Sequence, residues 1–207
     1  MNATVESLED APGIPLSFQG PASARVVASF GFWLFLLSDI VMFSALFAAY
    51  AVLSGETAGG LSGADLFDRR HVFIETLCLL FSSVTCGFGM LAIQREDARS
   101  AFRWMLLTFL LGATFVGLEV SEFYGMVARG AGPSRSAFLS SFFMLVGTHG
   151  LHVTTGLLWL LVMFAQVRSL GFKPMVTRRL FCFGLFWHAL DIVWVGVFTI
   201  VYLGAHR

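Results

Sequence analysis

Eight acidic and histidine side chains lie inside the long apolar stretches of this 207-residue chain. They are Asp39, Glu75, Glu119, Glu122, His149, His152, His188 and Asp191. Side chains of these types transfer protons and bind metals or haem. An ionisable group at the centre of a membrane-spanning helix costs about 2.5–3.5 kcal/mol on insertion scales, so it is expected to face protein or water and to have a role.

Asp39 and Glu75 are single carboxyl groups within their apolar stretches. Asp39 lies near the middle of its stretch, so we expect it to be protonated, hydrogen-bonded, or both. Ser38 is too close along the chain to suffice, which favours a partner on another helix. Asp39 is then either a polar link between helices or a proton-linked carboxylate. Glu75 lies near the start of its stretch, and we expect it to reach interfacial water as a helix-end carboxylate.

Glu119 and Glu122 are three residues apart and therefore share one face of a helix. Two like charges there repel unless one carboxyl is protonated or a cation intervenes. Arg129, Arg135 or a histidine on another helix are the candidate partners. The spacing leaves a structural network and a functional one equally open.

The histidines follow the same three-residue spacing. His149 and His152 share a helix face, and His188 with Asp191 forms a pair suited to a local hydrogen bond that fixes the imidazole tautomer. His149 and His188 on facing helices are candidate haem ligands, but a metal site needs three or four converging ligands. We favour histidines that are hydrogen-bonded to nearby carboxylates, with no catalytic, cofactor-binding or metal residues in the chain.

The composition indicates an integral membrane protein. Hydrophobic residues make up 57% and charged residues only 13%, and mean hydropathy is +0.80. The net charge is zero, which gives no reason to expect a nucleic-acid partner. A spanning helix needs roughly 20 mostly apolar residues. Five stretches qualify, which predicts an all-α bundle of five transmembrane helices, at about 26–53, 72–93, 102–127, 138–167 and 180–203.

The remaining residues predict one membrane domain, 26–207, preceded by a flexible tail, 1–25. The tail is acidic and lacks the basic start of a signal peptide. Five spans put the termini on opposite sides of the membrane. Eight Lys and Arg residues lie on the N-terminal side and five on the other, so we expect a cytoplasmic N-terminus and a periplasmic C-terminus. Gly147, Gly150 and Gly156 predict a close helix crossing around the histidines.

Several segments resemble subunit III of the haem–copper respiratory oxidases. They are FWLFLLSDIVMFSALFAAYAVL, SEFYGMVARGAGPSRSAFLSSFF, VGTHGLHVTTGLLW and FWHALDIVWVGVFTIVYL, in that order. Within the family the chain is most similar to the five-helix form of bacterial cytochrome o ubiquinol oxidases. Asp39 stands where the family often carries Glu. Some bacterial cytochrome c oxidases also have a five-helix subunit III, so that electron donor remains the alternative.

The resemblance implies a non-catalytic subunit of a proton-pumping terminal oxidase in the bacterial cytoplasmic membrane. Such a subunit stabilises subunit I and supports proton uptake while ubiquinol is oxidised and dioxygen is reduced to water. Haem and copper are then expected in subunit I, subunits I, II and IV as partners, and phospholipid between the helices. From the residues alone, a haem-binding protein using His149, His152 and His188 or a proton-coupled transporter using Asp39, Glu119 and Glu122 are less favoured alternatives.

Overall fold

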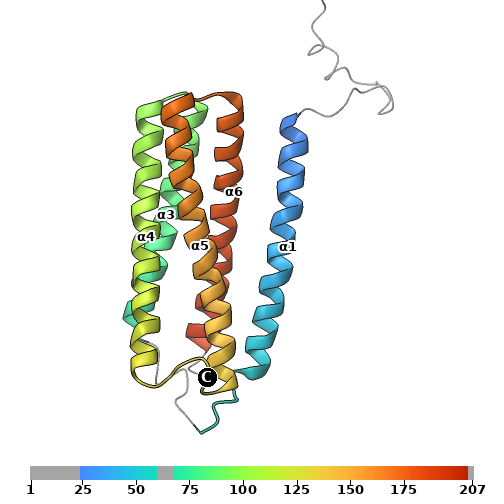
Figure 1. The fold of residues 1–207 in the computed structure, drawn as a ribbon, viewed down its shortest axis with the longest axis vertical. Coiled ribbons are helices and arrows are strands. Elements are labelled where there is room, and N and C mark those ends of the chain that lie inside the picture. Colours follow the sequence, from blue (N-terminus) through green and yellow to red (C-terminus); the bar gives the residue numbers. More distant parts are fainter. Residues whose placement is uncertain (1–23, 60–67, 205–207) are drawn as a thin grey trace, which may run out of the picture.

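The computed structural model describes residues 24–59 and 68–204, and these residues form an all-α bundle (Figure 1). Its helices are α1 (Ala24–Leu53), α3 (Arg69–Gln94), α4 (Ala98–Ala128), α5 (Ala137–Leu170) and α6 (Pro174–Val197), the last continuing as a π-helical segment, η3 (Phe198–Leu203). Five helices in this part of the chain are long and apolar enough to cross a membrane. The prediction of five spanning helices is therefore confirmed. Residues 1–23 of the predicted tail lie outside the residues that the structure describes.

Most helices extend beyond the apolar stretches that predict them, because capped polar turns continue them. Asp68 caps the start of α3 by accepting a hydrogen bond from the Arg70 backbone N–H at 3.0 Å. Asp97 caps α4 in the same way at Ser100, at 3.1 Å. α6 begins at Pro174, six residues before the apolar stretch, since proline lacks the N–H that the first helical turn leaves unused.

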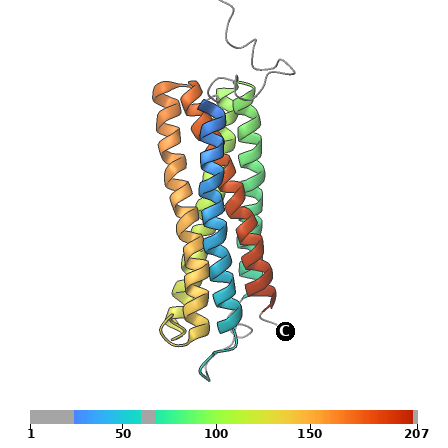
Figure 2. The ribbon, with the colours of Figure 1, turned by 90° about the vertical axis from the view of Figure 1, so that its right-hand side faces the viewer.

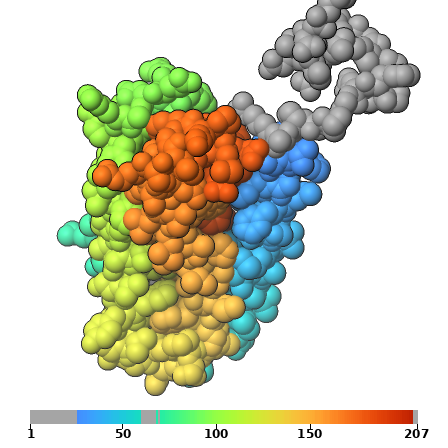
Figure 3. Space-filling model, turned by 45° about the horizontal axis from the view of Figure 1, so that its top comes forward, coloured from blue at the N-terminus to red at the C-terminus, as the bar shows by residue number. Residues whose placement is uncertain are grey.

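Four helices, α3 to α6, pack side by side, and α1 lies against their outer surface (Figures 1 and 2). α1 contacts α5 and α6 through aromatic side chains. The ring centroid of Phe43 lies 5.3 Å from that of His152, and the centroid of Phe32 lies 6.0 Å from that of Trp159, both on α5. On α6, a β-carbon at Gly196 would lie 3.2 Å from the Phe47 ring. The space-filling view shows α1 covering one flank of the bundle (Figure 3). Its other side is exposed and apolar, as at Val41, which suits lipid or another protein chain.

Large aromatic side chains fill the centre of the bundle. Trp187 of α6 is 1% exposed and lies against glycines of two neighbouring helices. A β-carbon at Gly112 of α4 would come within 2.8 Å of its indole ring, and one at Gly156 of α5 within 3.0 Å. Its Nε1 donates a hydrogen bond to the hydroxyl of Ser82 on α3 at 3.0 Å. This one side chain therefore fixes the distance of α6 from three other helices.

Candidate functional site

The structure brings Glu75 of α3 together with Glu119 and Glu122 of α4. All three carboxyl groups interact electrostatically with one another. Glu75 is 0% exposed and Glu119 3%. The prediction that Glu75 reaches interfacial water is wrong: α3 starts at Arg69, so Glu75 lies nearly two turns inside the helix, on the face that packs against α4.

Two residues that the sequence did not single out complete this acidic cluster. His71 lies one turn before Glu75, with its Nε2 3.3 Å from Glu75 Oε1 and 3.3 Å from the carbonyl oxygen of Leu118. The hydroxyl of Tyr202, in η3, donates to Glu122 Oε2 at 3.1 Å. The four-residue spacing of His71 and Glu75 was a detectable signal. Tyr202 lies 80 residues from its partner, and no local pattern predicts that contact.

The carboxyl group of Glu119 lies directly against α5. A β-carbon at Gly150 would overlap its oxygens and lie 2.7 Å from its carboxyl carbon. The predicted close approach of helices at these glycines is therefore present at Gly150 and Gly156. Gly147 is less crowded, because its nearest neighbour would be a Phe123 ring carbon at 3.5 Å.

His149 and His152 have separate surroundings. His149 is fully buried between the rings of Phe115 and Trp194, and its Nε2–H donates to the carbonyl oxygen of Leu190 on α6 at 3.2 Å. The prediction that this histidine is bonded to a carboxylate is therefore wrong. His152 donates from Nδ1 to the carbonyl oxygen of Thr148 at 2.8 Å, and its ring interacts electrostatically with Asp39 of α1. Asp39 and His152 are therefore electrostatic neighbours on different helices, and a hydrogen-bonding partner for Asp39 stays a prediction.

His188 and Asp191 are linked through a third residue. The hydroxyl of Ser83 on α3 lies 2.7 Å from His188 Nδ1 and interacts with the Asp191 carboxyl as well. Among the described residues, no hydrogen bond joins His188 directly to Asp191. The prediction of a direct hydrogen bond between these two side chains is therefore wrong. Their three-residue spacing places them on one face, and α3 inserts a serine there.

These groups are held in separate contacts rather than gathered around one centre. In residues 24–59 and 68–204, no three His, Cys, Asp or Glu side chains are arranged to hold a metal ion. His149 is bound to α6 and His188 to α3, so each ring serves a different contact between helices. The histidines act as polar links within the bundle.

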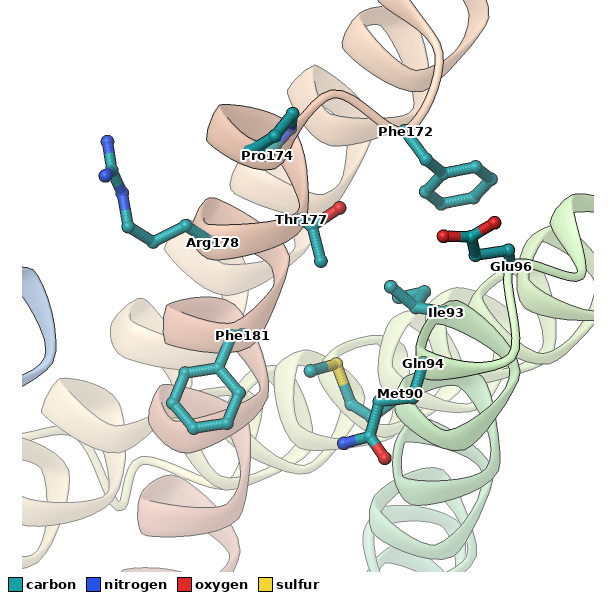
Figure 4. A pocket seen from close by; sticks show the side chains of 9 residues that line it. All are labelled: Met90, Ile93, Gln94, Glu96, Phe172, Pro174, Thr177, Arg178 and Phe181. Atoms are coloured by element: carbon teal, nitrogen blue, oxygen red, sulfur yellow. The ribbon is translucent and has the colours of Figure 1, made fainter. Parts of the chain in front are cut away.

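A separate cavity of about 500 Å³ lies at the other end of the bundle, between the α3–α4 and α5–α6 turns (Figure 4). Glu96 and Phe172 line one side, and Phe181 lies opposite them. Arg178 also borders the cavity, but its side chain extends away from it. None of the eight predicted residues lines this cavity.

The comparisons with known proteins agree with this architecture. The family described as "Cytochrome c oxidase subunit III" matches residues 17–206. The chain is 55% identical to the cytochrome bo(3) ubiquinol oxidase subunit 3 of Pseudomonas aeruginosa, over 84% of this chain and 83% of that protein. It is 52% identical to the protein of that name from Pseudomonas putida, over 84% of each chain. It is 46% identical to the quinol oxidase subunit 3 of Bacillus subtilis, over 84% of this chain and 85% of that protein.

The five spanning helices and the buried polar links between them define a multi-pass membrane protein. The chain belongs to the cytochrome c oxidase subunit III family, which confirms the resemblance to subunit III of the haem–copper oxidases. As a subunit III, it is one component of an oxidase with several subunits.

Proposed function

We propose that this chain is subunit III of a bacterial ubiquinol oxidase, in which ubiquinol is oxidised and dioxygen reduced to water. The observation that carries the proposal is the 55% identity, over most of both chains, to a protein named as subunit 3 of a ubiquinol oxidase. Two further relatives, at 52% and 46% identity, are also named for quinol rather than cytochrome c. These names favour quinol as the electron donor over cytochrome c.

In this proposal the chain is not catalytic itself. Haem and copper are held by subunit I, with subunits II and IV as further partners and phospholipid between the helices. The polar side chains of the bundle support this role, because His149, His188 and Trp187 each bind a neighbouring helix. The complex lies in the bacterial cytoplasmic membrane, and the excess of basic residues on the N-terminal side supports a cytoplasmic N-terminus.

The full chain, tagged and extracted from its native membrane in mild detergent, tests the proposal. We expect it to co-purify with a larger haem-bearing subunit, and we expect the complex to consume oxygen with ubiquinol but not with reduced cytochrome c. Oxygen consumption with cytochrome c alone would contradict the quinol assignment. A haem absorbance band retained by the chain after its partners are removed would contradict the non-catalytic role.

A further inference from the structure

Four carboxyl oxygens of the acidic cluster are buried without a hydrogen-bond partner among the described residues. They are both oxygens of Glu75, Oε2 of Glu119 and Oε1 of Glu122. Buried polar atoms are hydrogen-bonded in the great majority of cases, so each such atom needs an explanation. Glu75 is the strongest sign of a bound ligand, because its side chain is fully buried and both of its carboxyl oxygens lack a hydrogen-bond partner. It also lies on a different helix from Glu119 and Glu122, which it faces. A ligand shared by the three carboxyl groups would account for all four atoms.

The charges around the cluster do not balance three carboxylates. The titratable groups near the cluster include His71 and Cys78 of α3 and the carboxylate of Asp68, which caps that helix. η3 contributes the hydroxyl of Tyr202. On α4, Arg129 acts on Glu122, but it is exposed at the end of the helix. α5 adds the uncharged Gly150 at the point of contact. An unpaired buried charge costs several kcal/mol, and neighbouring carboxylates in one site cannot all ionise.

A metal ion would supply the missing positive charge, but the geometry does not favour one. The described part of the chain holds no three His, Cys, Asp or Glu side chains that are placed to ligate a metal together. Protons need no such coordination shell. A protonated carboxyl group donates to a neighbouring carboxyl oxygen, directly or through an ordered water molecule, and removes the charge at the same time.

His71 gives this cluster a route to the aqueous phase. Its side chain is 31% exposed, it lies in the first turn of α3, and its Nε2 is 3.3 Å from Glu75 Oε1. An imidazole has two ring nitrogens, so it can take up a proton at one and release a proton from the other. The Nε2–H of His71 donates to the carbonyl oxygen of Leu118, so the ring must reorient to aim this proton at Glu75 Oε1. A hydronium ion then gives a proton to Nδ1 while the proton on Nε2 moves to the carboxylate of Glu75, and a water molecule is left behind. The ring is left neutral, and the carboxylate becomes a carboxylic acid.

We propose that Glu75, Glu119 and Glu122 form a buried proton-binding site that exchanges protons with the aqueous phase through His71. The site lies near the end of the bundle where α3 begins and η3 ends, well away from the first turns of α1 (Figure 1). It is distinct from Asp39, whose electrostatic neighbour is His152. Proton binding at this site does not depend on which electron donor the oxidase uses. The proton-binding proposal can therefore be refuted while the proposed function as a ubiquinol oxidase subunit stands.

Infrared difference spectroscopy of the full chain, purified with its associated subunits, tests this site. The carbonyl stretch of protonated carboxylic acids is recorded across a pH titration and after transfer to heavy water. We expect protonated carboxyl bands that respond to pH and shift in heavy water. Glu75→Gln should remove one band and displace those of Glu119 and Glu122, because the groups share protons. Glu56→Gln, an exposed carboxyl in the chain after α1, is the matched control and should change none of them.

The access route has its own measurement. His71→Phe should slow the heavy-water shift several-fold while leaving the bands present. An equal rate in His71→Phe and the unaltered protein would overturn the route. The wild-type spectrum can overturn the proposal even if a variant fails to assemble. Absence of the bands, their insensitivity to pH, or their loss on adding Na⁺ or Ca²⁺ alone would each overturn proton binding.

Discussion

The carboxyl group of Glu119 fills the space that a side chain at Gly150 would occupy, with its carboxyl carbon 2.7 Å from the position of a β-carbon there. α4 and α5 therefore approach each other around a buried acid rather than around two apolar surfaces. Small residues that allow such close approach are typical of helix contacts in membranes. The acid and the glycine must fit together, and each limits what the other position tolerates.

Gly150→Ala should destabilise the protein by about 1–3 kcal/mol, the usual cost of forcing extra volume into a packed interior. Thermal unfolding of the purified protein in detergent measures it. Gly147→Ala on the same helix is the control and should have little effect, because its nearest neighbour is 3.5 Å away. Adding Glu119→Ala to Gly150→Ala should restore part of the loss. Equal stability of the two alanine variants would show that the contact at Gly150 is not tight.

Ser82→Ala should destabilise the bundle, because Nε1 of Trp187 loses its acceptor while remaining buried. Polar contacts between membrane helices average about 0.6 kcal/mol and reach about 1.7 kcal/mol. A double-mutant cycle with Trp187→Phe measures the coupling. Ser44→Ala on the exposed face of α1 is the control. A coupling near zero would show that the indole hydrogen bond adds nothing beyond packing.

Asp39→Asn should leave assembly with the other oxidase subunits intact, because an amide still forms hydrogen bonds. Asp39→Leu should weaken it by about 0.6–1.7 kcal/mol, the range for polar contacts between membrane helices. The amount of partner protein that co-purifies with each variant is the measurement. If both variants assemble equally, Asp39 is not a link between helices, and its interaction with His152 is incidental.

The start of α4 should become more mobile in acid. The backbone N–H of Ser100 donates to Asp97 and holds the pKa of that carboxyl below its ordinary value of 3.8. A lowered folded-state pKa means that this cap contributes stability above 3.8 and loses it as the pH falls through the lower value. Hydrogen exchange of the first turn of α4 should therefore accelerate below pH 3.8.

Two comparisons check the origin of that effect. Asp97→Asn should remove the pH dependence, since an amide caps a helix without titrating. The first turn of α5 is an internal control, because its cap is the hydroxyl of Ser136, which accepts from the Leu139 N–H at 3.2 Å. Acceleration of both turns together would point to general unfolding rather than to Asp97.

The sequence by itself determined the class of protein, the five spans and the face that each buried acid or histidine occupies. Apolar stretches of spanning length leave few alternatives to helices, because backbone groups in lipid must be satisfied within the chain. The three-residue spacings correctly placed Glu119 with Glu122. The segments around the histidines identified the family.

Only the tertiary structure decided which helix each of these faces meets. Helical periodicity fixes the direction of a side chain around its own axis, but neither the rotation of a neighbouring helix nor the depth at which it packs. Glu75 therefore faces Glu119 and Glu122 rather than interfacial water. His188 meets Ser83 across 105 residues of sequence, and Tyr202 reaches Glu122 across 80. The contacts of Glu75 and Tyr202 join separate buried acids into one acidic cluster with the partly exposed His71 at its edge.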